Sequence, residues 1–195
     1  MVSRKECTLL LLRGDDPATG ADSLLLGLKK RGFGAGKLNG FGGKLDPGET
    51  LLEGALREMA EESGVAVPPS SARHVGHLTF IFSGREAEEL HVHVFAATAP
   101  FSGAPVETEE MAPRWAPVAA LPFDQMWPDD AHWMPLLLRG ARFRGTFYFA
   151  GHAVIERFEL EEVGAEEASP CARAPDAAAA VLVPAGQPPQ TAVDF

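Results

Sequence analysis

Apolar side chains recur along the chain in short runs of strand length. They occupy Cys7–Leu12, Ser23–Lys30, His77–Phe82, Leu90–Ala97, Phe143–Phe149 and Ala153–Leu160. Polar, glycine- or proline-containing turns separate them, such as RGDDPATGAD after the first run. Runs of this length bounded by turn residues are typical of β-strands. We therefore predict a strand at each position, with the third and fourth paired across their turn.

Two other segments show helical features. Thr50 and Glu53 have the spacing of a capping box, and Gly64 follows as a C-terminal stop. Between them the apolar positions fall at i, i+3, i+4 and i+7, on one helix face: Leu52, Ala55, Leu56 and Met59. A second helix is predicted at Ala131–Arg139, after the turn WPDD. Strands combined with two helices favour a sheet covered on both faces.

The composition changes near Gly164. Of the 195 residues, those numbered 165–195 are rich in Ala, Pro and Gln and contain one short apolar patch. Such a segment cannot bury enough surface to offset the entropy of ordering it. The sequence therefore predicts one folded domain over residues 1–164 and a disordered tail over residues 165–195.

The charge and the cysteine content narrow the class of partner. A net charge of −10 repels the phosphate backbone of nucleic acids, so a nucleic-acid polymer is not expected. A small anionic substrate remains compatible if metal ions or local basic residues mask its charge. The two cysteines, Cys7 and Cys171, form no disulfide framework, which favours a reducing compartment. No apolar run approaches a membrane span. We expect a cytoplasmic monomer, with the nucleus or mitochondrion as alternative locations.

The Thr50–Ser63 helix carries an unusual acidic face. Glu58, Glu61 and Glu62 lie at i, i+3 and i+4, roughly opposite the apolar residues. Like charges at this spacing repel, and acids in the last turn oppose the helix dipole. One interpretation is a solvated surface. The other is a site for a hard cation such as Mg²⁺, which takes oxygen ligands.

The preceding segment, RGFGAGKLNGFGGKLDPGE, is too rich in glycine for a regular element and favours the second interpretation. Gly42, Gly43 and Gly48 let the backbone approach a phosphate or a metal closely. Glu49 stands eight residues before Arg57, a separation that an ion pair between loop and helix could bridge.

Loop and helix together reproduce a known motif. Gly43 is followed by five residues, Glu49, seven residues and Arg57–Glu58. The pattern ends with an aliphatic residue (Met59), any residue, Glu61–Glu62, any residue, Gly64 and Val65. This spacing matches the Nudix box at every position, a specific signal because so many positions are set. The segment therefore resembles the Nudix hydrolases, enzymes that cleave a diphosphate bond in a nucleotide.

The resemblance extends over residues 8–163. Five short segments are similar to those of the oxidised purine nucleoside triphosphate hydrolases within the superfamily, namely KKRGFGAG, NGFGGK, VHVF, WPDD and PLLL. This resemblance implies an α/β (α+β) fold, an α/β/α sandwich with a mixed β-sheet between helices. It also implies hydrolysis of 8-oxo-dGTP and 2-hydroxy-dATP to nucleoside monophosphate and pyrophosphate, which would sanitise the nucleotide pool.

The same resemblance implies a set of site residues. Glu58, Glu61 and Glu62 would be catalytic and, with the Gly42 carbonyl and Glu110, would hold Mg²⁺, or Mn²⁺ in its place. The substrate-binding residues would be Thr8, Lys29, Asn39, Phe41, Gly42, Gly43, Lys44, Phe80, Phe82, Trp127, Pro128, Asp129 and Asp130.

Side-chain chemistry agrees with these roles, although simpler roles remain open. Trp127 can stack on a purine, and Asn39 offers a donor and an acceptor to a base edge. Asp129 and Asp130 repel in an apolar pocket, so one can keep a proton near neutral pH and read an oxidised base. The two acids could equally cap the helix that follows. Phe80 and Phe82, which share a strand face, could be plain core.

Two departures from the family pattern bear on pocket shape, and two rival functions remain. Leu38 replaces an aromatic residue before Asn39, and Leu90–His91 replaces a Met–Asp pair. A Nudix hydrolase of another nucleoside diphosphate derivative is the rival within the enzyme class. A non-catalytic nucleotide-sensing module is the rival from another class, and it usually lacks a carboxylate of the box.

Overall fold

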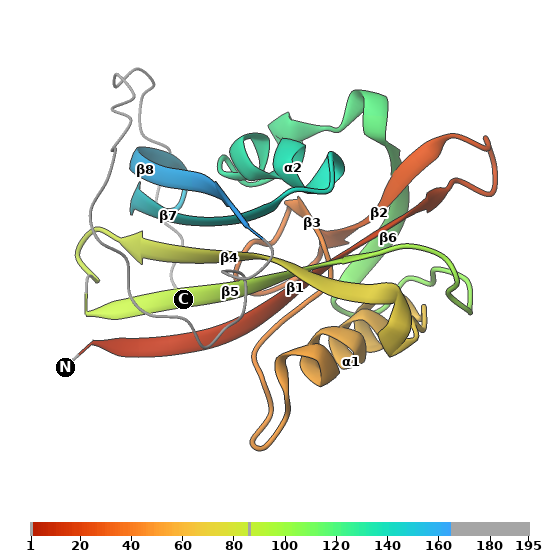
Figure 1. Cartoon of the computed structure of the whole chain (residues 1–195), viewed down its shortest axis with the longest axis horizontal. Coiled ribbons are helices and arrows are strands. Elements are labelled where there is room, and N and C mark those ends of the chain that lie inside the picture. Colours follow the sequence, from red (N-terminus) through yellow and green to blue (C-terminus); the bar gives the residue numbers. More distant parts are fainter. Residues whose placement is uncertain (1, 86, 165–195) are drawn as a thin grey trace.

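The computed structural model describes residues 2–85 and 87–164, which form one mixed β-sheet with a helix on each face (Figure 1). The predicted disordered tail, residues 165–195, lies outside the described residues. The strands follow the order β3-β2-β1-β5-β4-β7-β8, and β6 pairs with β2. β1 runs parallel to β5, and β4 runs parallel to β7, whereas the other pairs are antiparallel. The predicted fold class, an α/β/α sandwich with a mixed sheet, is confirmed.

The bounds of the elements agree with the predicted segments to within a few residues. The strands are β1 Ser3–Asp15, β2 Asp22–Lys29, β3 Leu38–Asn39, β4 Ala72–Phe82, β5 Glu88–Ala97, β6 Met111–Pro117, β7 Arg142–Ala150 and β8 Val154–Val163. The helices are α1 Leu51–Ser63 and α2 Asp130–Leu138, with three short 3-10 turns at Pro69–Ser71, Val118–Ala120 and Phe123–Gln125. No helix among the described residues has the length and apolar character needed to cross a membrane.

Alternation along β1 builds two separate cores. Leu9 and Leu11 pack on the α2 side of the sheet with Trp133, while Leu10 and Leu12 pack on the α1 side with Met59. Successive strand residues point to opposite faces, so an uninterrupted apolar run indicates a strand covered on both sides. The central position of β1 therefore follows from its own sequence.

The helix α1 begins and ends as predicted. The Thr50 side chain accepts from the Glu53 backbone N–H and the Glu53 carboxylate accepts from the Thr50 backbone N–H, which completes the capping box. Gly64 closes the helix in the left-handed region, at φ 74°. These local bonds fix where α1 starts, and so fix which of its residues face the sheet.

Two strands were not predicted. β6 contains Pro113 and ends at Pro117, and it pairs only with β2 among the described strands. Proline cannot donate to a ladder and is confined to edge strands, so its sequence carries a weak strand signal. The two residues of β3 lie within the glycine-rich segment for which no regular element was predicted, and they pair with Gly27 and Leu28.

Candidate functional site

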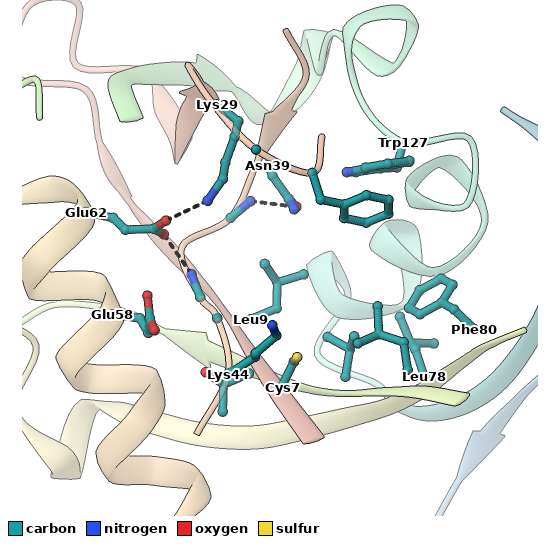
Figure 2. Close-up of a pocket in the computed structure, with 18 of the residues that line it drawn as sticks. Cys7, Leu9, Lys29, Asn39, Lys44, Glu58, Glu62, Leu78, Phe80 and Trp127 are labelled. Atoms are coloured by element: carbon teal, nitrogen blue, oxygen red, sulfur yellow. Dashed lines mark hydrogen bonds and ion pairs between the residues drawn. The ribbon is translucent and has the colours of Figure 1, made fainter. Parts of the chain in front are cut away.

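A cavity of about 740 Å³ opens between the glycine-rich loop, the acidic end of α1 and the strands β1 and β4 (Figure 2). It has an acidic end beside α1 and an aromatic end beside α2. Its lining includes most of the predicted site residues, namely Thr8, Lys29, Asn39, Gly42, Gly43, Lys44, Glu58, Glu62, Phe80, Phe82, Glu110, Trp127, Asp129 and Asp130. The tertiary structure therefore brings residues from distant parts of the chain into one chamber.

Glu62 is the most deeply placed acid of the α1 face. Its side chain is 5% exposed; Oε2 accepts from the Gly42 backbone N–H at 3.0 Å and Oε1 lies 3.2 Å from Lys29 Nζ. Burial raises the pKa of Glu62, and these two contacts only partly offset that effect. A carboxylate with so little solvent requires a nearby positive charge.

Lys29 supplies part of that charge and joins two elements. Its ammonium nitrogen lies 3.2 Å from Glu62 and 3.6 Å from Glu110 Oε2, and Figure 2 shows it pointing at Glu62. Arg31 donates to Glu110 Oε1 at 2.6 Å, and this bond holds the pKa of Glu110 below its usual range. Lys29, expected to contact substrate, therefore lies at the acidic end of the cavity.

Glu58 stands against the glycine loop. A Cβ at Gly43 would lie 2.5 Å from Glu58 Oε1, and a Cβ at Gly42 would lie 2.0 Å from the Thr8 carbonyl oxygen. A Cβ at Gly42 would overlap the backbone of β1, whereas at Gly43 it would meet only the end of the flexible Glu58 side chain. Close approach to β1 therefore requires glycine at Gly42, and the predicted approach of this backbone to a phosphate or a metal stays a prediction.

Glu61 occupies a different environment from the other two acids. Its side chain is 61% exposed and its Oε2 lies 3.0 Å from Arg57 Nη1. It does not line the large cavity but a smaller hollow beside it, together with Glu58, Glu62, Thr108, Glu109 and Glu110. Among residues 2–85 and 87–164, no three His, Cys, Asp or Glu side chains converge on a single point.

Arg57 braces the loop against the helix. Its guanidinium donates to both carboxylate oxygens of Glu49, at 2.8 and 3.0 Å, and to the Lys44 carbonyl oxygen at 3.2 Å. The Glu49 carboxylate also accepts from the Asp46 backbone N–H, and the pKa of Glu49 is lowered, chiefly by Arg57. The predicted ion pair between Glu49 and Arg57 is confirmed.

Asp129 and Asp130 lie at the aromatic end with almost no exposure, 4% and 2%. Asp129 accepts from Trp133 Nε1 at 2.9 Å, and Asp130 accepts from the Trp127 backbone N–H at 2.9 Å. Burial raises the pKa of Asp129 to about 6, and burial followed by repulsion from Asp129 raises the pKa of Asp130 well above its usual value. The pair therefore retains a proton near neutral pH.

The alternative role of these acids as a helix cap receives little support. Asp129 occupies the N-cap position of α2, but its side chain makes no capping hydrogen bond. Its carboxylate bonds instead to the Trp133 indole, and the Asp130 carboxylate holds the backbone before the helix. Both carboxyl groups also line the cavity.

Trp127 forms the aromatic wall with a partner that the sequence reasoning did not assign. The Phe33 ring stacks on it, with centroids 5.0 Å apart and planes at 30°. Lys37 Nζ lies 5.5 Å from the centroid of the Trp127 ring. Phe33 is 45% exposed and lies between Gly32 and Gly34, both at positive φ. Its place within the word KKRGFGAG was the only sequence signal, because an exposed aromatic in a glycine loop has no periodicity.

The remaining polar lining residues differ in how far they are satisfied. The Thr8 hydroxyl oxygen is buried and has no hydrogen-bond partner among the described residues. Asn39 Oδ1 accepts from the Gly40 backbone N–H at 2.9 Å.

Phe80 and Phe82 both line the cavity and pack against the α2-side core, so both interpretations of these rings hold. Cys7, which was not proposed for the site, also lines it.

Some expected pocket residues lie elsewhere. Phe41 is fully buried in the α1-side core beside Leu10, so it does not line the cavity. Pro128 is also absent from the lining. Of the two departures noted from sequence, Leu90 lines the cavity, whereas Leu38 is buried in the α2-side core. A strand residue faces whichever side its register dictates, which a motif cannot reveal.

Known proteins resemble this chain along most of its length. The family model for the NUDIX domain matches residues 8–137. An oxidized purine nucleoside triphosphate hydrolase from Danio rerio is 49% identical over 140 residues, 72% of this chain and 87% of that protein. The Mus musculus protein of the same name is 48% identical over the same shares.

A solved structure supports the fold. The MutT protein of Bacillus halodurans superposes with a TM-score of 0.66 at 22% identity, covering 80% of this chain and 97% of that one. The box spacing, the braced glycine loop and these matches agree, and the chain belongs to the NUDIX family.

Proposed function

We propose that this protein hydrolyses oxidised purine nucleoside triphosphates, such as 8-oxo-dGTP and 2-hydroxy-dATP, to the nucleoside monophosphate and pyrophosphate. The observation that carries the proposal is one cavity with an acidic end and an aromatic end, where a buried carboxyl pair retains a proton. The two relatives named for this activity, at 49% and 48% identity, support it.

The acidic end fits a divalent cation, as is general among Nudix hydrolases. Its donors are carboxylate oxygens, with Glu62 buried and Glu58 beside the loop, and hard cations prefer such ligands. Glu58, Glu61, Glu62 and Glu110 would hold the ion, and we propose Mg²⁺, with Mn²⁺ able to replace it. When bound, the ion neutralises phosphate charge and lowers the pKa of water.

The protein's own residues bind and orient the triphosphate. Gly42 and Gly43 line the cavity and carry no side chain that would separate their backbone from a phosphate. Lys44 also lines the cavity and adds positive charge beside this backbone. The phosphates would therefore lie along the glycine loop, between Lys44 and the acids of α1.

The aromatic end selects the base. An oxidised purine would pack against the aromatic wall that Trp127 and Phe33 form, and the carboxyl pair would meet its altered edge with one donor and one acceptor. Burial and mutual repulsion raise the pKa values of the pair, so one carboxyl would keep its proton and donate, and the other, ionised, would accept. A proton shift between the two would accommodate 2-hydroxyadenine. A site built to hydrogen-bond such a group rejects a base that lacks it, because the buried acids would remain unpaired.

Product analysis tests the proposal directly. We expect 8-oxo-dGTP with Mg²⁺ to yield 8-oxo-dGMP and pyrophosphate, and we expect competing dGTP to be turned over at least tenfold more slowly. Chelation of the metal should stop the reaction, and added Mg²⁺ should restore it. Equal turnover of the two nucleotides would favour a Nudix hydrolase of another substrate. Binding without any hydrolysis would favour the sensing module.

A further inference from the structure

Four of the chain's six histidines gather on one face of the sheet, outside the cavity. With two glutamates they form a group that we call the histidine cluster, made of Glu6, His74, His77, Glu89, His91 and His93. His93 shares a strand face with Phe95, which packs in the α1-side core. The cluster therefore lies on the α1 side of the sheet, on the neighbouring strands β1, β5 and β4, whose arrangement Figure 1 shows.

The cluster consists of two similar hydrogen-bonded chains. In one, Glu89 Oε2 lies 2.9 Å from His91 Nε2, and His91 Nδ1 lies 3.1 Å from His77 Nε2. In the other, Glu6 Oε2 lies 2.9 Å from His93 Nε2, and His93 Nδ1 lies 3.2 Å from His74 Nε2. Each chain runs from a carboxylate through one imidazole to a second imidazole on β4.

Cross-strand register brings the two chains together. His77 stands directly opposite His93, and their rings stack with centroids 4.7 Å apart and planes at 16°. His91 and His93 are buried, whereas His74 and His77 are only partly covered. The outer imidazole of each chain is therefore the one that solvent can reach.

This order of groups is the one found around metal-binding histidines. A ligating imidazole typically gives its second N–H to a carboxylate, which fixes the ring and makes the other nitrogen a better ligand. Glu89 and Glu6 hold His91 and His93 in that way, and the Nδ1 of each ring is hydrogen-bonded to a second imidazole. A cluster serving only to fill the sheet surface would not need the same carboxylate–imidazole–imidazole order twice.

The nitrogen separations also suit chelation. Two imidazole nitrogens that bind a tetrahedral Zn²⁺ at about 2.0–2.1 Å are about 3.3–3.4 Å apart. The two pairs are separated by 3.1 and 3.2 Å, so ring tilts and a few tenths of an ångström would admit an ion. Burial lowers the pKa of His77 to about 4 and also lowers that of His93, which leaves both rings neutral, as ligands must be, at pH 7.

We propose that the imidazole pairs His77–His91 and His74–His93 are binding sites for a borderline divalent transition-metal ion, with Zn²⁺ as the reference ion. Each pair supplies two nitrogen ligands and water supplies the others, since no three suitable side chains of the described segments meet at one point. The hydrogen now shared within a pair shifts to the far nitrogen of the outer ring, so both rings stay neutral. Nitrogen ligands distinguish these sites from the carboxylate site, which suits hard cations.

Metal titration of the full chain in excess Mg²⁺, which occupies the carboxylate site, tests this proposal. We expect Zn²⁺ to bind the unchanged protein, and Co²⁺ to give the visible absorption of nitrogen coordination. The double variant H74Q/H77Q should lose at least tenfold in Zn²⁺ affinity, and E89Q or E6Q should weaken its pair about 10- to 100-fold. The matched control H132Q, which alters a histidine outside the cluster, should bind as the unchanged protein does. Equal affinity in H74Q/H77Q would overturn the proposal.

A second measurement needs no variant, in case the double substitution unfolds the protein. Imidazole nitrogen chemical shifts of the unchanged chain report directly on each ring. We expect Zn²⁺ to shift the signals of the four cluster histidines and to leave those of His132 and His152 in place. Shifts confined to His132 and His152, or no shifts at all, would contradict the proposal.

Discussion

The Glu62 side chain is almost shielded from solvent, and burial raises the pKa of its carboxyl. It holds the Gly42 backbone and the Lys29 ammonium at once, so it ties α1 to the glycine loop and to β2. Glu61, one residue earlier, is exposed and paired with Arg57. Three acids that look alike in the sequence therefore have different surroundings, and only Glu62 combines burial with contacts to two other segments.

Replacing Glu62 with Gln is expected to abolish metal-dependent turnover while sparing the fold. The amide keeps the shape but removes the charge that would hold the cation, and the loss should exceed about a hundredfold in kcat because such an ion contributes several kcal/mol. Steady-state kinetics with 8-oxo-dGTP measures this, and circular dichroism checks folding. As a control, Glu107→Gln alters an exposed acid that lines neither the cavity nor the smaller hollow, and it should have little effect. Full activity in E62Q would rule out the proposed site.

Replacing Asp129 of the carboxyl pair with Asn is expected to weaken the selection of the base and to stabilise the fold. Burial raises the pKa of Asp129 in the folded protein to about 6, from about 4 in the unfolded chain. Ionisation of Asp129 therefore destabilises the fold as pH rises from about 4 through about 6. The Asp129→Asn variant should therefore melt at a higher temperature than the unchanged protein at pH 8, and this difference should be smaller at pH 4. It should also remove the inflection near pH 6 from kcat/KM and reduce discrimination between 8-oxo-dGTP and dGTP at least tenfold. An unchanged pH profile would contradict the assignment.

At the scale of elements, α1 positions the acids through its own ends. The capping box at Thr50 and the left-handed Gly64 set its start and end, and the bonds from Arg57 to Glu49 clamp the loop to its middle. All these contacts connect residues close in sequence. The box is therefore nearly a local structure, which is why its geometry follows from spacing alone.

Thr50→Ala should weaken α1 without touching the cavity. Loss of an N-cap side chain costs about 1 kcal/mol, so the denaturation midpoint should fall with an unchanged m-value. The kcat of the folded enzyme should remain that of the unchanged protein. Thr50→Ser retains the hydroxyl oxygen and serves as the control. A drop in kcat of the folded T50A protein would show that the cap also positions the acids.

The histidines of β4 and β5 also make the stability of the fold depend on pH. The pKa of His77 is lowered from 6.5 to about 4, chiefly by burial and then by the neighbouring His93 and His91. The unfolded chain binds this proton first, so stability is full above about pH 6.5 and is lost as pH falls toward about 4. His77→Gln should therefore flatten the stability curve over that window in urea titrations, whereas H132Q should flatten it less. Parallel curves for H77Q and the unchanged protein would contradict this account.

At the scale of the whole molecule, one sheet carries a core on each of its faces. The described buried members of the two cores run from Leu9 to Phe149. Because the composition of residues 165–195 offers too little apolar surface to order that segment, we propose that residues 1–164 fold as the functional unit. Removing residues 165–195 should leave both the melting temperature and kcat unchanged, as calorimetry and the nucleotide assay would measure. A lower melting temperature would assign the tail a structural role.

The sequence by itself determined the features that depend on short spacing. The box placed Glu58 and Glu62 on one helix face, the capping residues set α1, and the uninterrupted apolar run of β1 indicated a strand covered on both sides. The weak strand signal of β6 shows the limit of this approach, because proline hides an edge strand.

Only the tertiary structure decided which residues share the cavity. Phe33 and Leu90 line the cavity, whereas Phe41 and Leu38 lie in the cores. Register and loop path determine where each of these side chains points. The tertiary structure also buried the Asp129–Asp130 pair and aligned the histidine cluster across β1, β4 and β5. Burial and proximity depend on the pairing of segments far apart in the chain, so local pattern cannot supply them.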